Sequence, residues 1–173
     1  MTGHREPQPE TRGDEVDAIV TAWNTVRPDL DVTPLDVLSR ISRIARRLDQ
    51  ARSSVFTEHK LEGWEFDVMS ALRRAGEPFQ LSPGALVQQT LVTSGTMTNR
   101  VDRLEKRGYV AREPSPSDRR GVLVRLTPDG LTVVDAAFDA LLAHERRLLS
   151  GMDERGRADL ADSLRALLAA VET

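Results

Sequence analysis

The chain has 173 residues, of which 39% are hydrophobic and 29% are charged, and its net charge is −3. This composition fits a soluble protein with one folded unit, and no apolar run approaches the ~20 residues that a membrane-spanning helix needs. The sequence contains no cysteine, which excludes disulfides, thiolate metal sites and cysteine nucleophiles.

The N-terminal part of the chain predicts a tail followed by two helices. Residues 1–13 are polar and lack the apolar core of a secretory signal, so we expect a disordered tail on a cytoplasmic protein. A first helix is expected at about 14–26. A second helix begins near Thr33, with Pro34 in its first turn, and extends to about 60 because apolar residues recur along it at helical spacing.

The remainder predicts three shorter helices, a β-hairpin and two long helices. The short helices are expected at 64–75, from Ser82 and Pro83 onward, and from Thr93 or Ser94 to Gly108. The strands are expected at 109–114 and 121–126, and the long helices at 128–150 and 152–171. The predicted fold class is therefore mainly α with a small β-hairpin, divided into parts at 14–60, 61–127 and 128–173.

The helix that begins near Thr93 carries the first candidate DNA contacts. At about 100° per residue, Met97, Val101 and Leu104 form one apolar stripe that must pack on the domain. The other faces point outward, where Asn and Arg can read base edges while Thr and Lys can contact phosphates or a thymine methyl. The candidates are Thr93, Ser94, Gly95, Thr96, Thr98, Asn99, Arg103 and Lys106. The alternative is an ordinary solvated helix face.

The hairpin carries further basic candidates, namely Arg112 and, at its tip, Asp118, Arg119 and Arg120. Two arginines at an exposed tip suit the negative minor groove, and Asp118 could fix one of them by a paired contact. Residues 93–125 carry a charge of +4 against −7 for the rest of the chain, which favours a directed DNA-binding face. A solubilising arginine pair on an edge strand is the alternative. We therefore expect a winged helix-turn-helix that binds DNA and associates with the nucleoid.

Three segments resemble the MarR family of bacterial winged-helix transcriptional regulators: TSGTMTNR, DRLEKRGYV and DRRGVLVRLTPDG. The resemblance covers about Leu35 to Asp153. It implies an obligate homodimer, formed by the N- and C-terminal helices, that binds a pseudo-palindromic operator with one recognition helix per half-site. A two-fold interface would bury the apolar stripes of the C-terminal helices, which contain Leu141, Leu142, Leu148, Leu149, Leu160, Leu164, Leu167 and Leu168.

The segments WNTVRPDLDVTP, WEFDVMSALRRAGEPFQLSP and TMTNRVDRLE are similar to the urate-responsive branch of this family, which has an extra first helix bearing a tryptophan. The resemblance implies a ligand site formed by Trp23, Asp67, Arg74 and Arg100. Because that branch includes relatives that respond to trans-aconitate or related carboxylates, the ligand stays open between urate, another purine and such an acid.

Helical geometry agrees with part of this site. Asp67 and Arg74 are seven residues apart and share one helix flank, and Arg100 lies roughly 60° to 70° from the apolar stripe, so it can reach beneath its helix. An anionic ligand would engage Arg74 or Arg100, stack on Trp23 and donate ring N–H groups to Asp67. It would thereby pull the recognition helix and weaken operator binding. A structural Asp–Arg network, with Trp23 in simple packing, is the alternative.

Other function classes find little support in the residues. The sequence has no phosphate-binding loop, no G-x-S-x-G motif and no metal-ligand spacing, and its histidines, His4, His59 and His144, are scattered. We therefore expect no enzymatic activity, no cofactor and no metal. A constitutive DNA-binding protein without a small-molecule ligand remains the rival to a ligand-responsive repressor.

Overall fold

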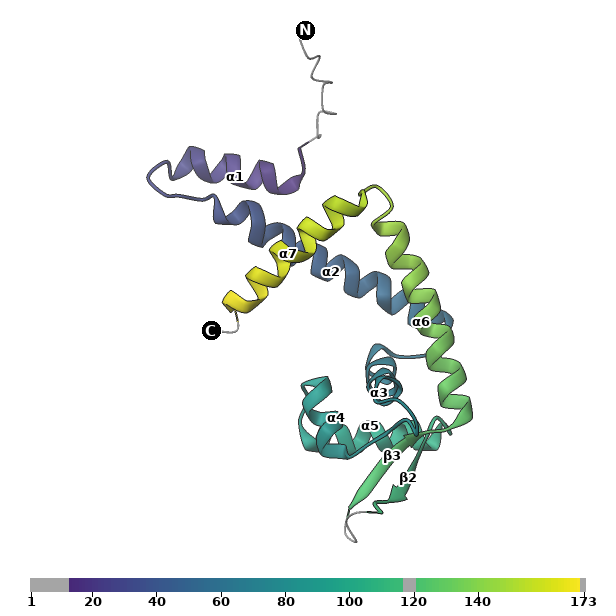
Figure 1. The fold of residues 1–173 in the computed structure, drawn as a ribbon. Helices are drawn as coiled ribbons and strands as arrows, with labels where there is room; N and C mark the ends of the chain where they lie inside the picture. The colour runs from purple at the N-terminus through teal and green to yellow at the C-terminus, as the bar shows by residue number, and fades with distance from the viewer. Residues whose placement is uncertain (1–12, 117–120, 172–173) are drawn as a thin grey trace. The chain divides into compact units, whose positions relative to one another are not determined.

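The computed structural model describes residues 13–116 and 121–171 (Figure 1). The chain divides into two compact units, residues 1–51 and 52–173. The division falls within one long helix, whereas the parts expected from the sequence divide at 60 and 127; those functional boundaries stay predictions. The elements in chain order are α1 (Glu15–Val26), α2 (Pro34–Glu58), α3 (Gly63–Arg74), β1 (Gln80–Leu81), α4 (Pro83–Thr90), α5 (Ser94–Lys106), β2 (Val110–Pro114), β3 (Val122–Leu126), α6 (Pro128–Leu148) and α7 (Glu154–Val171).

The first unit contains α1 and the N-terminal part of α2. The Asp14 side chain accepts hydrogen bonds from the backbone N–H groups of Val16 and Asp17, and the Asp17 side chain accepts one from the Asp14 N–H in return. This capping box satisfies backbone donors at the start of α1 and explains why the helix begins where the sequence predicts it. Within α1 only Val16 is buried, so apolar packing contributes little to holding this helix.

The second unit has one hydrophobic core, to which the end of α2, the helices α3 to α6 and the sheet contribute. Phe56 of α2 stacks on Phe66 of α3 with the ring centres 4.4 Å apart. Met69 and Leu72 are fully buried on α3, and Leu86 on α4. These contacts fix α3 in the core, so the remaining flank of this helix can present polar side chains at defined positions.

The sheet is antiparallel, with the strand order β1-β3-β2. The strands β2 and β3 form the predicted hairpin, in which Val110 pairs with Leu126. The two-residue strand β1 was not predicted; it adds to the other edge of β3, where Gln80 pairs with Arg125. Two residues are too few to show the alternation of apolar and polar side chains from which a strand is predicted. The hairpin is thus the larger part of a three-stranded sheet.

The Thr-Pro-Asp-Gly segment before α6 anchors the hairpin to the end of α5. The Thr127 hydroxyl donates to the Gly108 carbonyl at 2.6 Å and accepts from the Gly130 N–H at 3.0 Å. A Cβ atom on Gly130 would lie 2.0 Å from the Tyr109 carbonyl oxygen, so a larger residue does not fit there. This close approach gives a physical reason for the threonine and glycine of the LTPDG motif.

The C-terminal helix α7 has no buried residue along its length. Its apolar side chains Leu160, Leu164 and Leu168 are exposed at a spacing of four, and α6 exposes Phe138 and Leu148. The leucines therefore line one face of α7 that this unit leaves open to solvent. Among the described residues, no helix is both long and apolar enough to cross a membrane.

Candidate DNA interface and ligand site

Helix α5 turns its apolar stripe to the core and its polar side chains to solvent. Met97, Val101 and Leu104 are buried, which confirms the stripe predicted from helical spacing. Thr93 caps the helix by accepting a hydrogen bond from the Thr96 N–H at 3.3 Å. All eight residues predicted on this helix to contact DNA are exposed: Thr93, Ser94, Gly95, Thr96, Thr98, Asn99, Arg103 and Lys106.

Among these exposed side chains, those of Ser94, Asn99 and Lys106 make no hydrogen bond or ion pair with another residue that the structure describes. A free amide can donate to and accept from an adenine edge, and a free ammonium can contact a phosphate. A Cβ on Gly95 would meet nothing within 4 Å, so the backbone is open to a close approach at the first turn. The first turn and the middle of α5 are therefore available for contacts with a partner.

Two of the predicted DNA-contacting arginines are engaged by acidic side chains of the same chain. Arg112 on β2 pairs with Asp102 of α5 at 2.5 Å and also with Glu105. Arg103 of α5 pairs with Glu62, at the start of α3, at 2.5 Å. The Arg112 pairs connect the strand to α5 and help to hold the wing in a fixed position beside this helix.

The tip of the wing falls on Asp118, Arg119 and Arg120, which lie outside the described residues. The strands that lead to it are described, and the Ser115 N–H donates to the Gly121 carbonyl at 2.9 Å. The part that these three residues take in DNA binding stays a prediction.

Asp67, on the flank of α3, lies within the electrostatic influence of three arginines, Arg52, Arg74 and Arg100. It makes no hydrogen bond or ion pair with any residue in the described part of the chain. Loss of surrounding water raises the pKa of the Asp67 carboxyl above its usual value, against the opposing attraction of the three guanidinium groups. The residue is nevertheless exposed by surface area, so its carboxyl remains accessible. One carboxylate among three cations leaves this position with an excess of positive charge.

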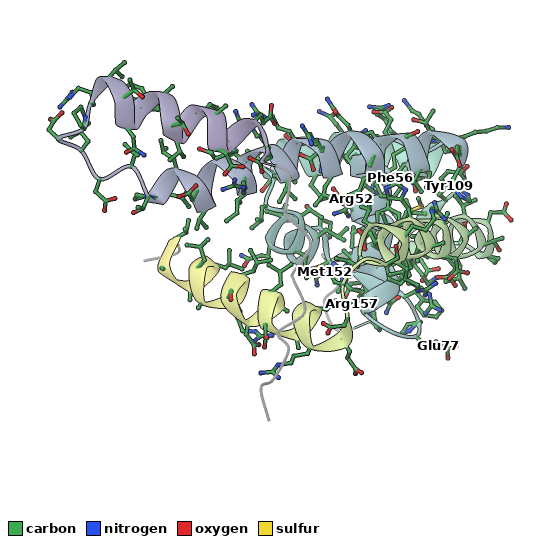
Figure 2. The ribbon with its side chains drawn as sticks, turned by 90° about the horizontal axis from the view of Figure 1, so that it is seen from above. Arg52, Phe56, Glu77, Tyr109, Met152 and Arg157 are labelled. Carbon is green, nitrogen blue, oxygen red and sulfur yellow. The ribbon has the colours of Figure 1, made fainter. Side chains whose placement is uncertain are left out.

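Arg74 and Arg100 were predicted for this site from the sequence, whereas Arg52 was not. Arg52 lies near the end of α2, where its guanidinium carbon is 6.0 Å from the centre of the Phe56 ring (Figure 2). Because Phe56 packs on Phe66 of α3, this turn of α2 is held beside the helix that carries Asp67. The spacing of apolar residues along α2 does not show which helix Phe56 packs on, so the position of Arg52 could not be predicted from it.

Trp23, the fourth residue of the predicted ligand site, belongs to the first unit, whereas Asp67, Arg74 and Arg100 belong to the second. It lies on α1 with 46% of its surface exposed, so its ring is available for stacking. Its participation in one site with the other three residues stays a prediction.

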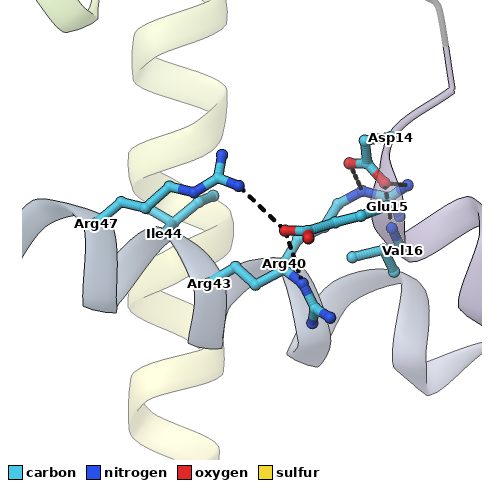
Figure 3. A pocket seen from close by; sticks show the side chains of 7 residues that line it. All are labelled: Asp14, Glu15, Val16, Arg40, Arg43, Ile44 and Arg47. Carbon is cyan, nitrogen blue, oxygen red and sulfur yellow. Dashed lines mark hydrogen bonds and ion pairs between the residues drawn. The ribbon is translucent and has the colours of Figure 1, made fainter.

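The first unit has a cavity of its own, of about 320 Å³, whose charged side chains pair with one another (Figure 3). Arg40 contacts Asp14 at 2.8 Å and, outside the lining, Asp17 at 2.6 Å, while Glu15 contacts Arg43 at 2.9 Å. The hydrogen bond from Arg40 lowers the pKa of Asp14 to about 2. The cavity is lined by Asp14, Glu15, Val16, Arg40, Arg43, Ile44 and Arg47, so it includes none of the predicted ligand residues.

Comparisons with known proteins agree on one family. A sequence model of the MarR family matches residues 59–121. The transcriptional regulator PecS of Dickeya dadantii is 39% identical over 158 residues, which cover 91% of this chain and 93% of that protein.

Solved structures of the family are also similar. Sco5413 of Streptomyces coelicolor, a MarR family transcriptional regulator, superimposes with a TM-score of 0.67 and 25% identity, over 82% of this chain and 97% of that one. BpsR of Bordetella bronchiseptica, whose DNA binding is regulated by 6-hydroxynicotinic acid, superimposes with a TM-score of 0.57 and 28% identity. The superposition covers 74% of this chain and 98% of BpsR. With an α5 helix presented beside a β-hairpin and near full-length similarity to PecS, this chain belongs to the MarR family of winged-helix transcriptional regulators.

Proposed function

We propose that this protein is a ligand-responsive repressor, which binds a pseudo-palindromic operator as a homodimer and releases it when a small anionic ligand binds. The observation that carries the proposal is the position of Asp67, whose carboxyl lies within the electrostatic influence of three arginines and forms an ion pair with none of them in the described part of the chain. One of these arginines, Arg100, belongs to α5, so a ligand held there would act directly on the recognition helix.

The DNA contacts follow from the exposed face of α5 and from the wing. Asn99 is free to pair with a base edge and Lys106 with a phosphate, while the backbone at Gly95 is open to close approach. Arg119 and Arg120 at the wing tip would enter the adjacent minor groove. In this proposal α5 recognises the base sequence of the operator, and the wing recognises the shape of the minor groove.

A homodimer would cover the apolar face of α7. Leu160, Leu164 and Leu168 share one exposed helix face, and a second copy of the chain could bury it through a two-fold contact. Two recognition helices related by such an axis match the two half-sites of a pseudo-palindrome.

A flat anion is the ligand that suits these residues best. Guanidinium groups of Arg52, Arg74 and Arg100 would bind its negative charge, Asp67 would accept its ring N–H donors, and the exposed ring of Trp23 would stack on it. Urate or a related purine has all three properties, and a carboxylate such as trans-aconitate or citrate has the charge alone. Regulation of BpsR by 6-hydroxynicotinic acid is consistent with a flat acidic ligand in this family.

The ligand would weaken DNA binding by drawing Arg100 toward the site and with it α5, which changes how the two recognition helices of a dimer fit the operator. A coupling of ~1 to 3 kcal/mol changes affinity about 5- to 150-fold, which is enough for a regulatory switch.

The test is a DNA mobility-shift titration on the protein's own upstream region with urate, xanthine, trans-aconitate and citrate. We expect urate to dissociate the complex, and we expect Asp67→Ala and Arg100→Ala to abolish the response while retaining DNA binding. Arg73→Gln is the matched control, because Arg73 also lies on α3 but pairs with Asp135. A constitutive DNA-binding protein would instead show no change in DNA binding or in Tm with any of the four compounds.

A further inference from the structure

Trp64, in the first turn of α3, contacts two arginines of the recognition helix. The guanidinium carbon of Arg103 lies 4.6 Å from the ring centre and that of Arg100 lies 5.5 Å from it. The Trp64 Nε1–H donates to Glu62 Oε2 at 2.6 Å, and the other oxygen of Glu62 accepts from Arg103 Nη2 at 2.5 Å. These four side chains form one connected cluster, which we call the α3–α5 clasp.

The clasp holds Arg103, a residue on the proposed DNA-binding face of α5 that would otherwise be free to contact DNA. Arg103 follows Asn99 by four residues and precedes Lys106 by three, so it shares their exposed side of α5. Its guanidinium is instead paired with Glu62 and stacked on Trp64. A carboxylate beside this arginine both neutralises its charge and would repel an approaching phosphate.

We propose that Glu62 and Trp64 are positioning residues that hold Arg103 against α3, and that Arg103 must leave Glu62 to contact a DNA phosphate. The proposal rests on the proposed function only in requiring that α5 binds DNA.

The exposure of the pair makes such an exchange feasible. The side chains of Glu62 and Arg103 are 57% and 56% exposed, so water and salt screen their attraction. Contact with DNA, in contrast, releases condensed counterions for each phosphate neutralised. A phosphate can therefore replace Glu62 as the partner of Arg103, and the clasp reduces DNA affinity without preventing binding.

Trp64 also connects the clasp to the Asp67 site. Arg100 contacts the Trp64 ring and is one of the three arginines whose charge acts on Asp67. An anion that draws Arg100 away leaves the electron-rich ring to Arg103 alone, which strengthens the attraction between this ring and Arg103. A ligand that binds Arg100 would thus hold Arg103 more firmly on Trp64 and make Arg103 less available to DNA.

A second arginine cluster in the same unit has the same chemistry without contact to α5. Arg73 of α3 pairs with Asp135 of α6 at 2.8 Å and lies 4.9 Å from the centre of the Phe79 ring. Neutralising Asp135, the partner of Arg73, changes the net charge of the protein by the same amount as neutralising Glu62, the partner of Arg103. Asp135→Asn is therefore the matched control for Glu62→Gln.

The decisive experiment measures operator affinity without any ligand, over a range of salt concentrations. Glu62→Gln keeps an oxygen that can accept the hydrogen bond from Trp64 but removes the charge that holds Arg103. We expect Glu62→Gln to bind the upstream DNA about two- to five-fold more tightly, the range that loss of an exposed ion pair gives. Asp135→Asn should bind like the unaltered protein.

Two further variants keep the result interpretable if Glu62→Gln unfolds, which a thermal melt would show. Trp64→Phe weakens the cation–π contact with Arg103 and removes the hydrogen bond that holds the Glu62 carboxylate in place, so it should also tighten ligand-free binding. Arg103→Gln should lower the slope of log affinity against log salt by about 0.9, the contribution of one phosphate contact. In the Arg103→Gln background, Glu62→Gln should have no further effect on affinity.

The proposal is overturned if folded Glu62→Gln or Trp64→Phe binds DNA no more tightly than the unaltered protein. An equal gain in Asp135→Asn, or a gain from Glu62→Gln that persists without Arg103, overturns it as well. These measurements need no effector, so a protein that binds DNA but ignores urate contradicts the proposed ligand response and leaves the clasp proposal standing. Absence of any DNA binding overturns both proposals.

Discussion

Two arginine clusters, one in each unit of the molecule, are arranged in opposite ways. In the first unit Arg40 contacts three aspartates, Asp14, Asp17 and Asp36, so its guanidinium is fully engaged. In the second unit three arginines act on a single carboxylate, Asp67, and none forms an ion pair with it in the described ranges. The first arrangement is complete without a ligand, whereas the second has charge left to bind one.

This difference separates structural ion pairs from a candidate binding site better than the presence of a cavity does. The cavity beside Arg40 is lined by charges that already pair with one another, and the apolar packing of α1 rests on Val16. Its ion pairs serve to attach α1 to α2. The positive excess around Asp67, in contrast, is not needed for attachment, because the core already fixes α3.

The largest expected effect comes from replacing an arginine of α2 by glutamine, either near Asp67 or beside the cavity of the first unit. Arg52→Gln should raise the urate concentration needed for half-dissociation of DNA about tenfold, since a charge-assisted contact to the anion is lost. Arg43→Gln should leave that concentration unchanged, because Arg43 is committed to Glu15. Mobility-shift titrations of both variants measure the effect, and equal shifts would remove the distinction between the two regions.

A second substitution tests whether the first region is structural. Arg40→Gln removes the contacts to the N-terminal cap of α1, so amide hydrogens of α1 should exchange about tenfold faster while those of α5 keep their rates. Hydrogen exchange followed by mass spectrometry resolves the two helices. Unchanged exchange in α1 would show that the ion pairs are not what holds this helix.

Local patterns in the sequence predicted the elements and the face of each helix, because helical spacing and capping depend on near neighbours. They placed Met97, Val101 and Leu104 in the core, which the structure confirms. Arg100, predicted to reach beneath its helix, is partly buried and contacts the Trp64 ring. The two-residue strand β1 was not predicted, because only its pairing with β3 identifies it as a strand.

Contacts between elements were not predictable in the same way. Trp64 packs against the hydrophobic core, and its ring also contacts Arg100 and Arg103 from α5. Arg52 was overlooked because its proximity to Asp67 depends on how Phe56 packs. Both residues are recognisable only once α2, α3 and α5 are placed side by side, which no spacing along one helix reveals.

The two aspartates should also respond oppositely to pH. Arg40 lowers the folded-state pKa of Asp14 to about 2, so this carboxylate stabilises the first unit above its usual pKa and loses that contribution as the pH falls to about 2. The pKa of Asp67 is raised instead, so at a pH above the usual pKa of an aspartate the ionisation of Asp67 opposes folding. Carboxyl carbon NMR titration should show Asp14 protonating last of the two. The reverse order would contradict the contrast between a paired and an unpaired carboxylate.

The smallest expected effect is on thermal stability at neutral pH. Because the environment of Asp67 disfavours its charge, Asp67→Asn should leave Tm unchanged or raise it by about 1–3 °C. Asp14→Asn should lower Tm, since it removes the charge that pairs with Arg40 while the asparagine can still cap α1. Calorimetry of both variants at pH 7 checks the signs. A clear loss of Tm in Asp67→Asn would mean that this carboxylate stabilises the fold, and the three arginines would then form a structural network and not a ligand site.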